Sequence, residues 1–277
     1  STMSPVNRHR LSGWRKSTWL PGRARLTIKN LGIRDAYEGI HFDNVDLSAI
    51  SSDSICDHGS TGIWLTNGSE TNTVSNSQVQ FVQYGIYLDG GSGNTFSGNY
   101  VTNNTSPGIT IQGCASNVVT SNRVLNSSSS GIAIDGAGAT SNTITGNTAD
   151  SNVYGIAIGS SANNNTISSN TARYNSSAGI NLGTDASFNT CSMNTLTSNW
   201  FGLYLLVRAS VNTIESNTIQ SNTTNGVEVK NTCTGNIFRT NIVVSNSNNG
   251  FLFTDTSTRN VLRNNLIRSN AHAGAKL

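Results

Sequence analysis

One pattern constrains the fold of this chain more than any other. A glycine followed by an apolar, a variable and a second apolar residue returns at a nearly constant interval. The marker glycines are always 23 or 24 residues apart, at Gly39, Gly62, Gly85, Gly108, Gly131, Gly155, Gly179, Gly202, Gly226, Gly250 and Gly274. A fixed period of this length indicates a repeat architecture in which each unit buries its apolar face against the next.

A second pattern lies within each repeat. An asparagine precedes a short polar and apolar pair, as at Asn94, Asn142 and Asn212, and further asparagines often follow at intervals of five residues. Asparagine tolerates the left-handed backbone that a tight corner requires, and its amide can both donate and accept a hydrogen bond. We therefore predict that these residues occupy corners and form hydrogen-bonded ladders from repeat to repeat.

The apolar residues between these markers come singly or in alternating pairs. This is the period of a short strand with one buried face, and no helical period is present. Three short strands per repeat, separated by Asn or Gly turns, describe one coil of a parallel β-helix. We predict an all-β solenoid of about eleven coils of 23–24 residues over residues 25–277.

Residues 1–24 do not share the repeat. They contain Trp14 and Trp19, they are rich in basic residues, and no acidic residue occurs before Asp35. The end of a solenoid exposes core side chains and unpaired strand edges, which need a cover. We predict that this segment is an N-terminal cap, or alternatively an arm that docks on a partner.

Charge and hydropathy argue against several function classes. The formal net charge is only +3 and the basic residues are unevenly distributed, so a uniformly basic nucleic-acid surface is not indicated. No apolar run is long enough for a membrane-spanning helix, and the N-terminus lacks the apolar stretch of a signal peptide. The four cysteines share no metal-site spacing, and the methionines and histidines are scattered. We therefore predict no metal site, no cofactor and no membrane insertion.

The repeat "SNTITGNTADSNVYGIAIGSS" at residues 141–161 resembles the right-handed parallel β-helix repeats of NosD-type proteins and of the wider carbohydrate-binding and sugar-hydrolase β-helix family. The resemblance covers residues 25–277. It implies a right-handed solenoid and an extracellular, cell-surface or periplasmic protein that engages polysaccharide. The family also includes lyases, glycosidases, mannuronan epimerases, phage tailspikes and surface proteins. The chain lacks both the Asp-Pro-His-Asp motif of the epimerases and the clustered Asp pairs of the pectin-cleaving glycosidases.

The strand that follows each marker glycine defines two outward columns, because alternate residues of a strand point to opposite faces. The first column begins with His41, Trp64 and Tyr87, and the second contains Asp43 and Asp89. Farther along the chain both columns turn to Ala and Gly. The first three coils therefore carry a stripe of rings flanked by carboxylates.

Such a stripe is suited to sugars, because rings stack on the apolar faces of pyranoses and carboxylates accept hydrogen bonds from hydroxyls. Two coils separate Asp43 from Asp89, about 9–10 Å, which is at or just beyond the upper limit for an inverting pair of carboxylates. The predicted catalytic residues are Asp43, Asp89 and His41, and the predicted substrate-binding residues are Trp64, Tyr87, Asp35, Glu38 and His58. If the chain is an enzyme, we expect a polysaccharide lyase or a glycoside hydrolase, and only for a lyase is calcium a possible cofactor.

Two other interpretations remain open from the sequence. The chain could be a structural surface, spike or filament module that self-associates by stacking its solenoid ends, without catalysis. A second outward array of small hydroxyl residues, such as Thr143 and Thr145, is of the kind that ice-binding solenoids use. That array changes to charged residues at Glu215 and Arg239, which weakens the ice-binding interpretation.

Overall fold

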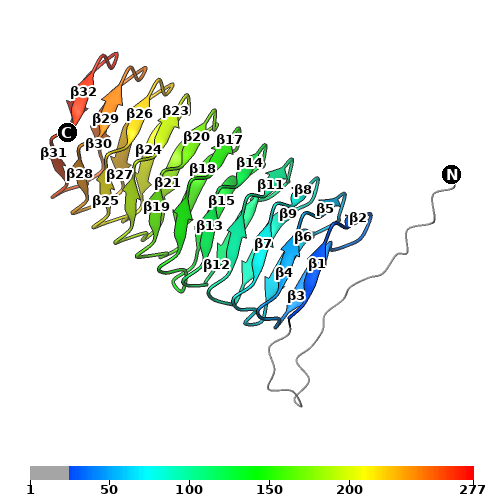
Figure 1. Cartoon of the computed structure of the whole chain (residues 1–277). Helices are drawn as coiled ribbons and strands as arrows, with labels where there is room; N and C mark the ends of the chain where they lie inside the picture. The colour runs from blue at the N-terminus through cyan, green and yellow to red at the C-terminus, as the bar shows by residue number, and fades with distance from the viewer. Residues whose placement is uncertain (1–24) are drawn as a thin grey trace.

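The computed structural model describes residues 25–277, which form 33 β-strands and no helix, so this part of the chain offers no helix that could cross a membrane. The predicted parallel β-solenoid is confirmed. The coils lie side by side and build one elongated body, with the chain advancing steadily from one end to the other (Figure 1). The predicted cap or arm at residues 1–24 lies outside the described residues.

Each coil contributes one strand to each of three parallel sheets of 11 strands. Sheet 1 consists of β1 (Thr27–Lys29), β4 (Ala49–Ser51), β7 (Thr73–Ser75), β10 (Thr95–Ser97), β13 (Val118–Thr120), β16 (Thr143–Thr145), β19 (Thr166–Ser168), β22 (Thr190–Ser192), β25 (Thr213–Glu215), β28 (Ile237–Arg239) and β31 (Val261–Arg263). Sheet 2 consists of β2 (Gly32–Arg34), β5 (Ser54–Cys56), β8 (Gln78–Gln80), β11 (Tyr100–Thr102), β14 (Arg123–Leu125), β17 (Thr148–Asp150), β20 (Thr171–Arg173), β23 (Thr195–Thr197), β26 (Thr218–Gln220), β29 (Ile242–Val244) and β32 (Leu266–Arg268).

Sheet 3 holds most of the longer strands, which follow the marker glycines. It consists of β3 (Ile40–Asp43), β6 (Thr61–Thr66), β9 (Tyr84–Asp89), β12 (Ile109–Gln112), β15 (Ser130–Asp135), β18 (Tyr154–Gly159), β21 (Ala178–Leu182), β24 (Phe201–Leu206), β27 (Val227–Lys230), β30 (Phe251–Phe253) and β33 (Ala275–Lys276). The longer strands give sheet 3 two inward apolar residues per strand, such as Ile86 and Leu88 of β9, where a three-residue strand has one.

The core is one continuous apolar column. A three-residue strand contributes one inward side chain, such as Ile144, which is fully buried between the half-exposed Thr143 and Thr145. The parallel register places Ile144 beside Ile167 in the next coil. Stacking like residues at the strand spacing of about 4.8 Å removes each coil's apolar side chains from water, which no single coil could do alone.

The predicted asparagine ladders are confirmed. The side-chain amide of Asn122 donates from Nδ2 to Oδ1 of Asn147 over 3.0 Å, and its backbone N–H reaches the same oxygen over 2.9 Å. Nδ2 of Asn122 donates its other hydrogen to the carbonyl oxygen of Phe96 over 2.9 Å. Asn147 repeats the first two contacts toward Asn170. The amides are buried, so the ladder satisfies backbone groups at the corners that would otherwise lack partners.

The prediction that the ladder asparagines themselves take the left-handed conformation is wrong. The residue before each one does so: Ser121 has a φ of 56° before Asn122, and Ser169 has a φ of 56° before Asn170. The left-handed residue turns the chain at the corner, and the turn allows the following side chain to point inward. Small polar residues and glycine are common at these positions because they reach this region at low cost.

The sequence also predicts ladder positions in the first two coils, at Asn30 and Asp35 and at Asp53 and His58, and the same offset corrects the first pair. Asn30 and Asp35 are left-handed corner residues, with φ of 57° and 59°, and are not ladder members. Asp53 and His58 do occupy ladder positions, as predicted. Oδ1 of Asp53 accepts a hydrogen bond from the backbone N–H of Leu31 over 2.8 Å, and Nδ1 of His58 accepts one from a backbone N–H of the first coil over 3.1 Å.

The marker glycines are required by close packing between coils. A Cβ atom at Gly179 would lie 2.8 Å from the carbonyl oxygen of Gly202 and 2.9 Å from Nδ2 of Asn199. Its φ lies outside the left-handed region, so its role is the close backbone approach and not a corner.

Candidate functional site

The predicted outward column exists on sheet 3. The parallel register pairs His41 of β3 with Trp64 of β6, and Trp64 with Tyr87 of β9. Each of the three is a half-exposed residue between two buried apolar neighbours of its strand, so all three rings lie on the outer side. We call His41, Trp64 and Tyr87 the ring ladder.

The ring ladder is a stack along the solenoid axis. The His41 and Trp64 centroids are 4.3 Å apart with planes 12° apart, and Tyr87 follows at 6.4 Å from Trp64 with a tilt of 35°. The centroid spacing is close to the strand spacing of about 4.8 Å, so the flat faces of the first two rings are turned toward each other. Because His41 covers one face of Trp64, the indole presents mainly its edge to solvent.

Tyr84 extends the ring ladder sideways, and the sequence analysis missed it. Its ring lies 5.2 Å from that of Tyr87, and both belong to β9. Its position just before the marker Gly85 was the available signal. Burial and the nearby Asp89 carboxylate raise the pKa of Tyr87, so its hydroxyl remains protonated at neutral pH and can donate a hydrogen bond.

Several polar atoms on this face have no partner within the described part of the chain. They are Nε2 of His41, Nε1 of Trp64 and Oγ1 of Thr110, which follows Tyr87 in the same column. Nδ1 of His41 contacts the Glu38 carboxylate over 3.1 Å. Buried polar groups normally find partners, so these three atoms on one side of sheet 3 require an explanation.

Carboxylates line the neighbouring column. The register runs from Asp43 to Thr66, Asp89, Gln112 and Asp135, one residue per coil. We call Asp43, Asp89 and Asp135 the acidic row. Successive members are two coils apart, about 10 Å at the strand spacing. Within the described residues none of the three has an ion pair, and Asp43 accepts a hydrogen bond from Nδ2 of Asn67 over 2.8 Å.

The structure brings together only part of the predicted site. Glu38 lies beside the ring ladder through its contact with His41. Asp35 is exposed at a corner between β2 and β3, and among the described residues no hydrogen bond or ion pair joins it to the rings. His58 is only 5% exposed and belongs to an interior ladder, so it does not line this face. A histidine in the position of a ladder asparagine is explained by its ring nitrogen, which replaces the amide oxygen as acceptor.

A second group on sheet 3 was not singled out from the sequence. Phe201 and Tyr204 of β24 lie 4.9 Å apart, and the exposed Trp200 packs edge-on against Phe201. In the next coil Lys230 lies over the Tyr204 ring at 5.3 Å, and its Nζ is 3.7 Å from Glu228. Tyr204 and Glu228 belong to the same column as the ring ladder, which was the available signal.

The Glu228 carboxylate is held in one orientation. Nδ2 of Asn225 donates to it over 2.9 Å, and Oδ1 of Asn225 is fixed by two hydrogen bonds from Asn249. Burial raises the pKa of Tyr204, while a hydrogen bond with Tyr204 raises that of Lys230. Sheet 3 therefore carries a polar aromatic group near each end, with small residues such as Ala133 and Ala157 between them.

Two family models match the sequence, and each covers more than half of it. Residues 19–172 match the right handed beta helix region, and residues 134–276 match a model described as periplasmic copper-binding protein (NosD). A search of characterised proteins by sequence finds no match.

Solved structures with a similar fold include the Azotobacter vinelandii mannuronan C-5 epimerase AlgE4 A-module, with a TM-score of 0.74, 14% identity, and coverage of 91% of this chain and 78% of that one. A mutant of the periplasmic alginate epimerase AlgG gives 0.68 at 13% identity, covering 90% and 73%. Pectate lyase Pel9A gives 0.57 at 16% identity, covering 80% and 70%. At these identities the likeness concerns the fold alone.

Proposed function

The chain belongs to the right-handed β-helix family, and on that premise we propose that it binds polysaccharide along sheet 3 of its N-terminal coils. The observation that carries this proposal is the ring ladder of His41, Trp64 and Tyr87 with the acidic row beside it. The rings of Tyr84 and Tyr87 and the carboxylates of the acidic row offer apolar contact and hydrogen-bond acceptors along one outer face, which suits an extended chain of sugars. We further propose that the protein acts outside the cytoplasm, where such polymers occur.

The detailed contact differs from the sequence expectation. His41 occupies one face of Trp64, so a sugar would meet the indole edge and the ring of Tyr87. The Tyr87 hydroxyl and the carboxylates of Asp43 and Asp89 would hydrogen-bond sugar hydroxyls. Glu38 would hold the His41 ring through the contact at Nδ1.

Cleavage is a narrower proposal on the same face. Asp43 and Asp89 are about 10 Å apart at the strand spacing, at or just beyond the upper limit of the separation at which two carboxylates activate water and protonate a leaving group. His41 lies two residues from Asp43 on the same face of β3 and would supply a further proton-transfer group. The steps proposed here use only these side chains.

Binding is tested by measuring retention of the purified chain on immobilised polysaccharides of varied composition. The expected result is retention on at least one of them, weakened about tenfold or more by Trp64→Ala or Tyr87→Ala, with thermal stability little changed. Tyr174→Ala is a matched control, because Tyr174 is an exposed aromatic residue at a corner, with a φ of 59°. Absence of retention on every polysaccharide would refute the proposal.

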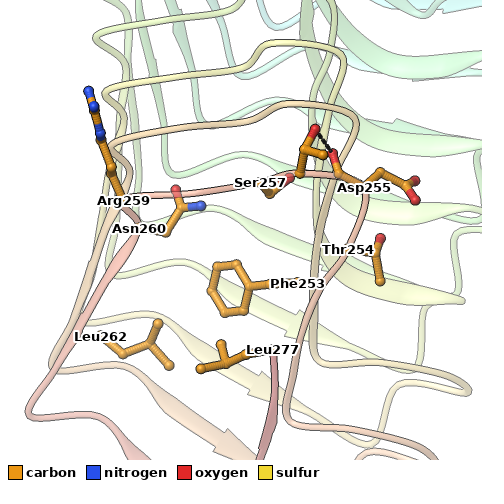
Figure 2. Close-up of a pocket in the computed structure, with 9 residues that line it drawn as sticks. Phe253, Thr254, Asp255, Ser257, Arg259, Asn260, Leu262 and Leu277 are labelled. Atoms are coloured by element: carbon orange, nitrogen blue, oxygen red, sulfur yellow. Dashed lines mark hydrogen bonds between the residues drawn. The ribbon is translucent and has the colours of Figure 1, made fainter.

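A structural module is a second candidate, and the C-terminal coil favours it. Phe253, Leu262 and Leu277 are the apolar residues of a pocket of about 410 Å³ there, whose other lining residues are polar (Figure 2). The last coils are basic, with Arg259, Arg263, Arg268 and Lys276, whereas the first coils are acidic. A second copy stacked head to tail would cover the pocket and pair opposite charges.

End-to-end stacking is tested by analytical ultracentrifugation across a range of concentrations. If the chain is a structural module, it forms multimers that Leu262→Arg disrupts and that weaken with salt. Leu266→Arg, an exposed outward residue of β32, is the matched control. A chain that remains monomeric at all concentrations would exclude this candidate.

Copper binding is not part of the proposal, because the donors in residues 134–276 do not fit the metal. Burial raises the pKa of the Cys191 thiol to about 12 and that of Cys233 to about 11, which disfavours the thiolate that copper requires. Met193 is exposed on a corner, and the described residues hold no group of three or more His, Cys, Asp or Glu side chains able to share a metal ion.

A further inference from the structure

The charged side chains of the first coils are almost all negative. Between Asp35 and Asn122 the sequence holds eight acidic residues and not a single lysine or arginine. The same stretch spans the coils that carry the ring ladder. The basic residues that flank this stretch, Lys29 and Arg34 before it and Arg123 after it, lie on sheets 1 and 2, away from sheet 3.

The acidic row places part of this charge beside the ring ladder. Asp43, Asp89 and Asp135 follow one another at about 10 Å intervals, which is comparable to the screening length of about 10 Å at 0.1 M salt. Their potentials therefore overlap at moderate ionic strength, and the row acts on a ligand as one extended negative field. A polymer with carboxylates on successive sugars would be repelled along its whole length.

An independent observation points to a ligand at the same place. Thr110 is 5% exposed and lies on the outer side of β12 between Tyr87 and Ala133, and its Oγ1 has no partner within the described residues. Its strand neighbour Gln112 lies in the column of the acidic row, between Asp89 and Asp135. The Thr110 hydroxyl can accept a hydrogen bond, and two members of the acidic row, Asp89 and Asp135, lie one coil to either side of it, which suits a ligand that brings hydrogen-bond donors.

We propose that the acidic row selects a polysaccharide that carries amino groups and rejects one built of uronic acids. This inference rests on the proposed polysaccharide binding and specifies its substrate class. An ammonium group donates three hydrogen bonds and carries the charge that the row lacks. The fold neighbours whose names refer to alginate and pectate act on polyuronates, so the proposal separates this chain from them by charge.

The test compares three polymers. Glucosamine oligomers and N-acetylglucosamine oligomers of equal length share one backbone and differ at the nitrogen on C2, which is an ammonium group in the first when protonated and a neutral acetamide in the second. Polygalacturonate, which has a different backbone, supplies the anionic case. We expect the amino polymer to bind about tenfold more tightly than the acetylated one, with affinity falling steeply as salt rises, and polygalacturonate not to bind. The triple variant Asp43→Asn, Asp89→Asn, Asp135→Asn should remove most of that preference.

A control with the same change in charge tests whether the effect belongs to this face. Asp57→Asn, Glu215→Gln and Asp255→Asn alter acids at a corner, on sheet 1 and in the turn after β30, and should leave the preference intact. Tighter binding of polygalacturonate, equal binding of both oligomers, or a preference that survives the acidic-row variant would each overturn the selectivity while leaving polysaccharide binding standing. If none of the three polymers is retained but a neutral one is, the selectivity is likewise wrong. If no polysaccharide is retained at all, the proposed function itself fails.

Discussion

The imidazole of His41 lies against the indole of Trp64, with centroids 4.3 Å apart and planes 12° apart. The two residues come from adjacent coils, so their contact depends on the coil stacking and not on proximity in the sequence. The same imidazole contacts Glu38 through Nδ1. His41 thus contacts both the Trp64 ring and the Glu38 carboxylate, and substitutions can separate the stacking contact from the polar contact.

His41→Phe should keep the stack and lose the polar contact, whereas His41→Ala should lose both. A stacked ring pair contributes about 1 kcal/mol, so we expect the alanine variant to lower the free energy of unfolding by about that amount and the phenylalanine variant to be nearly neutral. Denaturant unfolding measures stability, and Trp64 fluorescence reports the ring contact. Equal losses in both variants would show that the stack contributes nothing measurable.

If sheet 3 supports cleavage, Asp43→Asn and Asp89→Asn should each abolish product release and leave polysaccharide retention within a few fold. The amide keeps the size and hydrogen-bonding capacity of the side chain but cannot transfer the proton. The assays are the release of reducing ends for a hydrolase and of unsaturated products for a lyase. Asp57→Asn is the control on a corner outside the face, and activity that survives both substitutions would remove these residues from the chemistry.

Ser127→Asn should stabilise the fold, because the interior ladder is interrupted there. Nδ2 of the buried Asn104 has no acceptor within the described residues, and the residue that follows it in the ladder is Ser127. Ser127 itself donates its backbone N–H to Oδ1 of Asn152 over 2.8 Å, so the backbone already has ladder geometry. We expect a gain of about 1 kcal/mol in thermal or denaturant unfolding. Ser128→Asn, at an exposed neighbour, should give no gain.

Asp53→Asn should stabilise the protein at neutral pH and should change the pH dependence of its stability. Asp53 is 2% exposed, and burial raises the pKa of its carboxyl despite hydrogen bonds from the backbone of Leu31 and Ser51. Its Oδ2 atom has no partner within the described residues. A carboxyl with a raised folded pKa binds its proton more tightly in the folded state.

The free energy of unfolding of the wild type should therefore fall as the pH rises from below the unfolded pKa through the raised folded pKa. The asparagine variant lacks this fall, so its advantage of about 1 kcal/mol should be present at pH 7 and disappear in acid. Unfolding curves recorded from acidic to neutral pH measure the difference. Asp57→Asn, at an exposed corner of the same coil, should not reproduce it.

Much of the fold could be predicted because the same pattern of glycine, asparagine and apolar residues recurs in nearly every coil. The marker glycines gave the register, and the alternation of apolar and polar residues gave the inward face, as at Ile144 and Ile167. The outward columns followed from the same alternation, so His41, Trp64 and Tyr87 were correctly placed as neighbours. Where the first coils depart from the repeat, the assignment of Asn30 and Asp35 was off by one residue.

The sequence alone determined the class of fold, the number of coils, their register and the columns that share a face, because each depends on a period that is written along the chain. The tertiary structure decided what those columns can contact. Whether Trp64 presents a face or an edge, and whether His58 lies inside or outside, depends on side chains 22 to 24 residues away in adjacent coils. Such contacts form between coils that lie about 4.8 Å apart, and they cannot be predicted from the residue pattern within one coil.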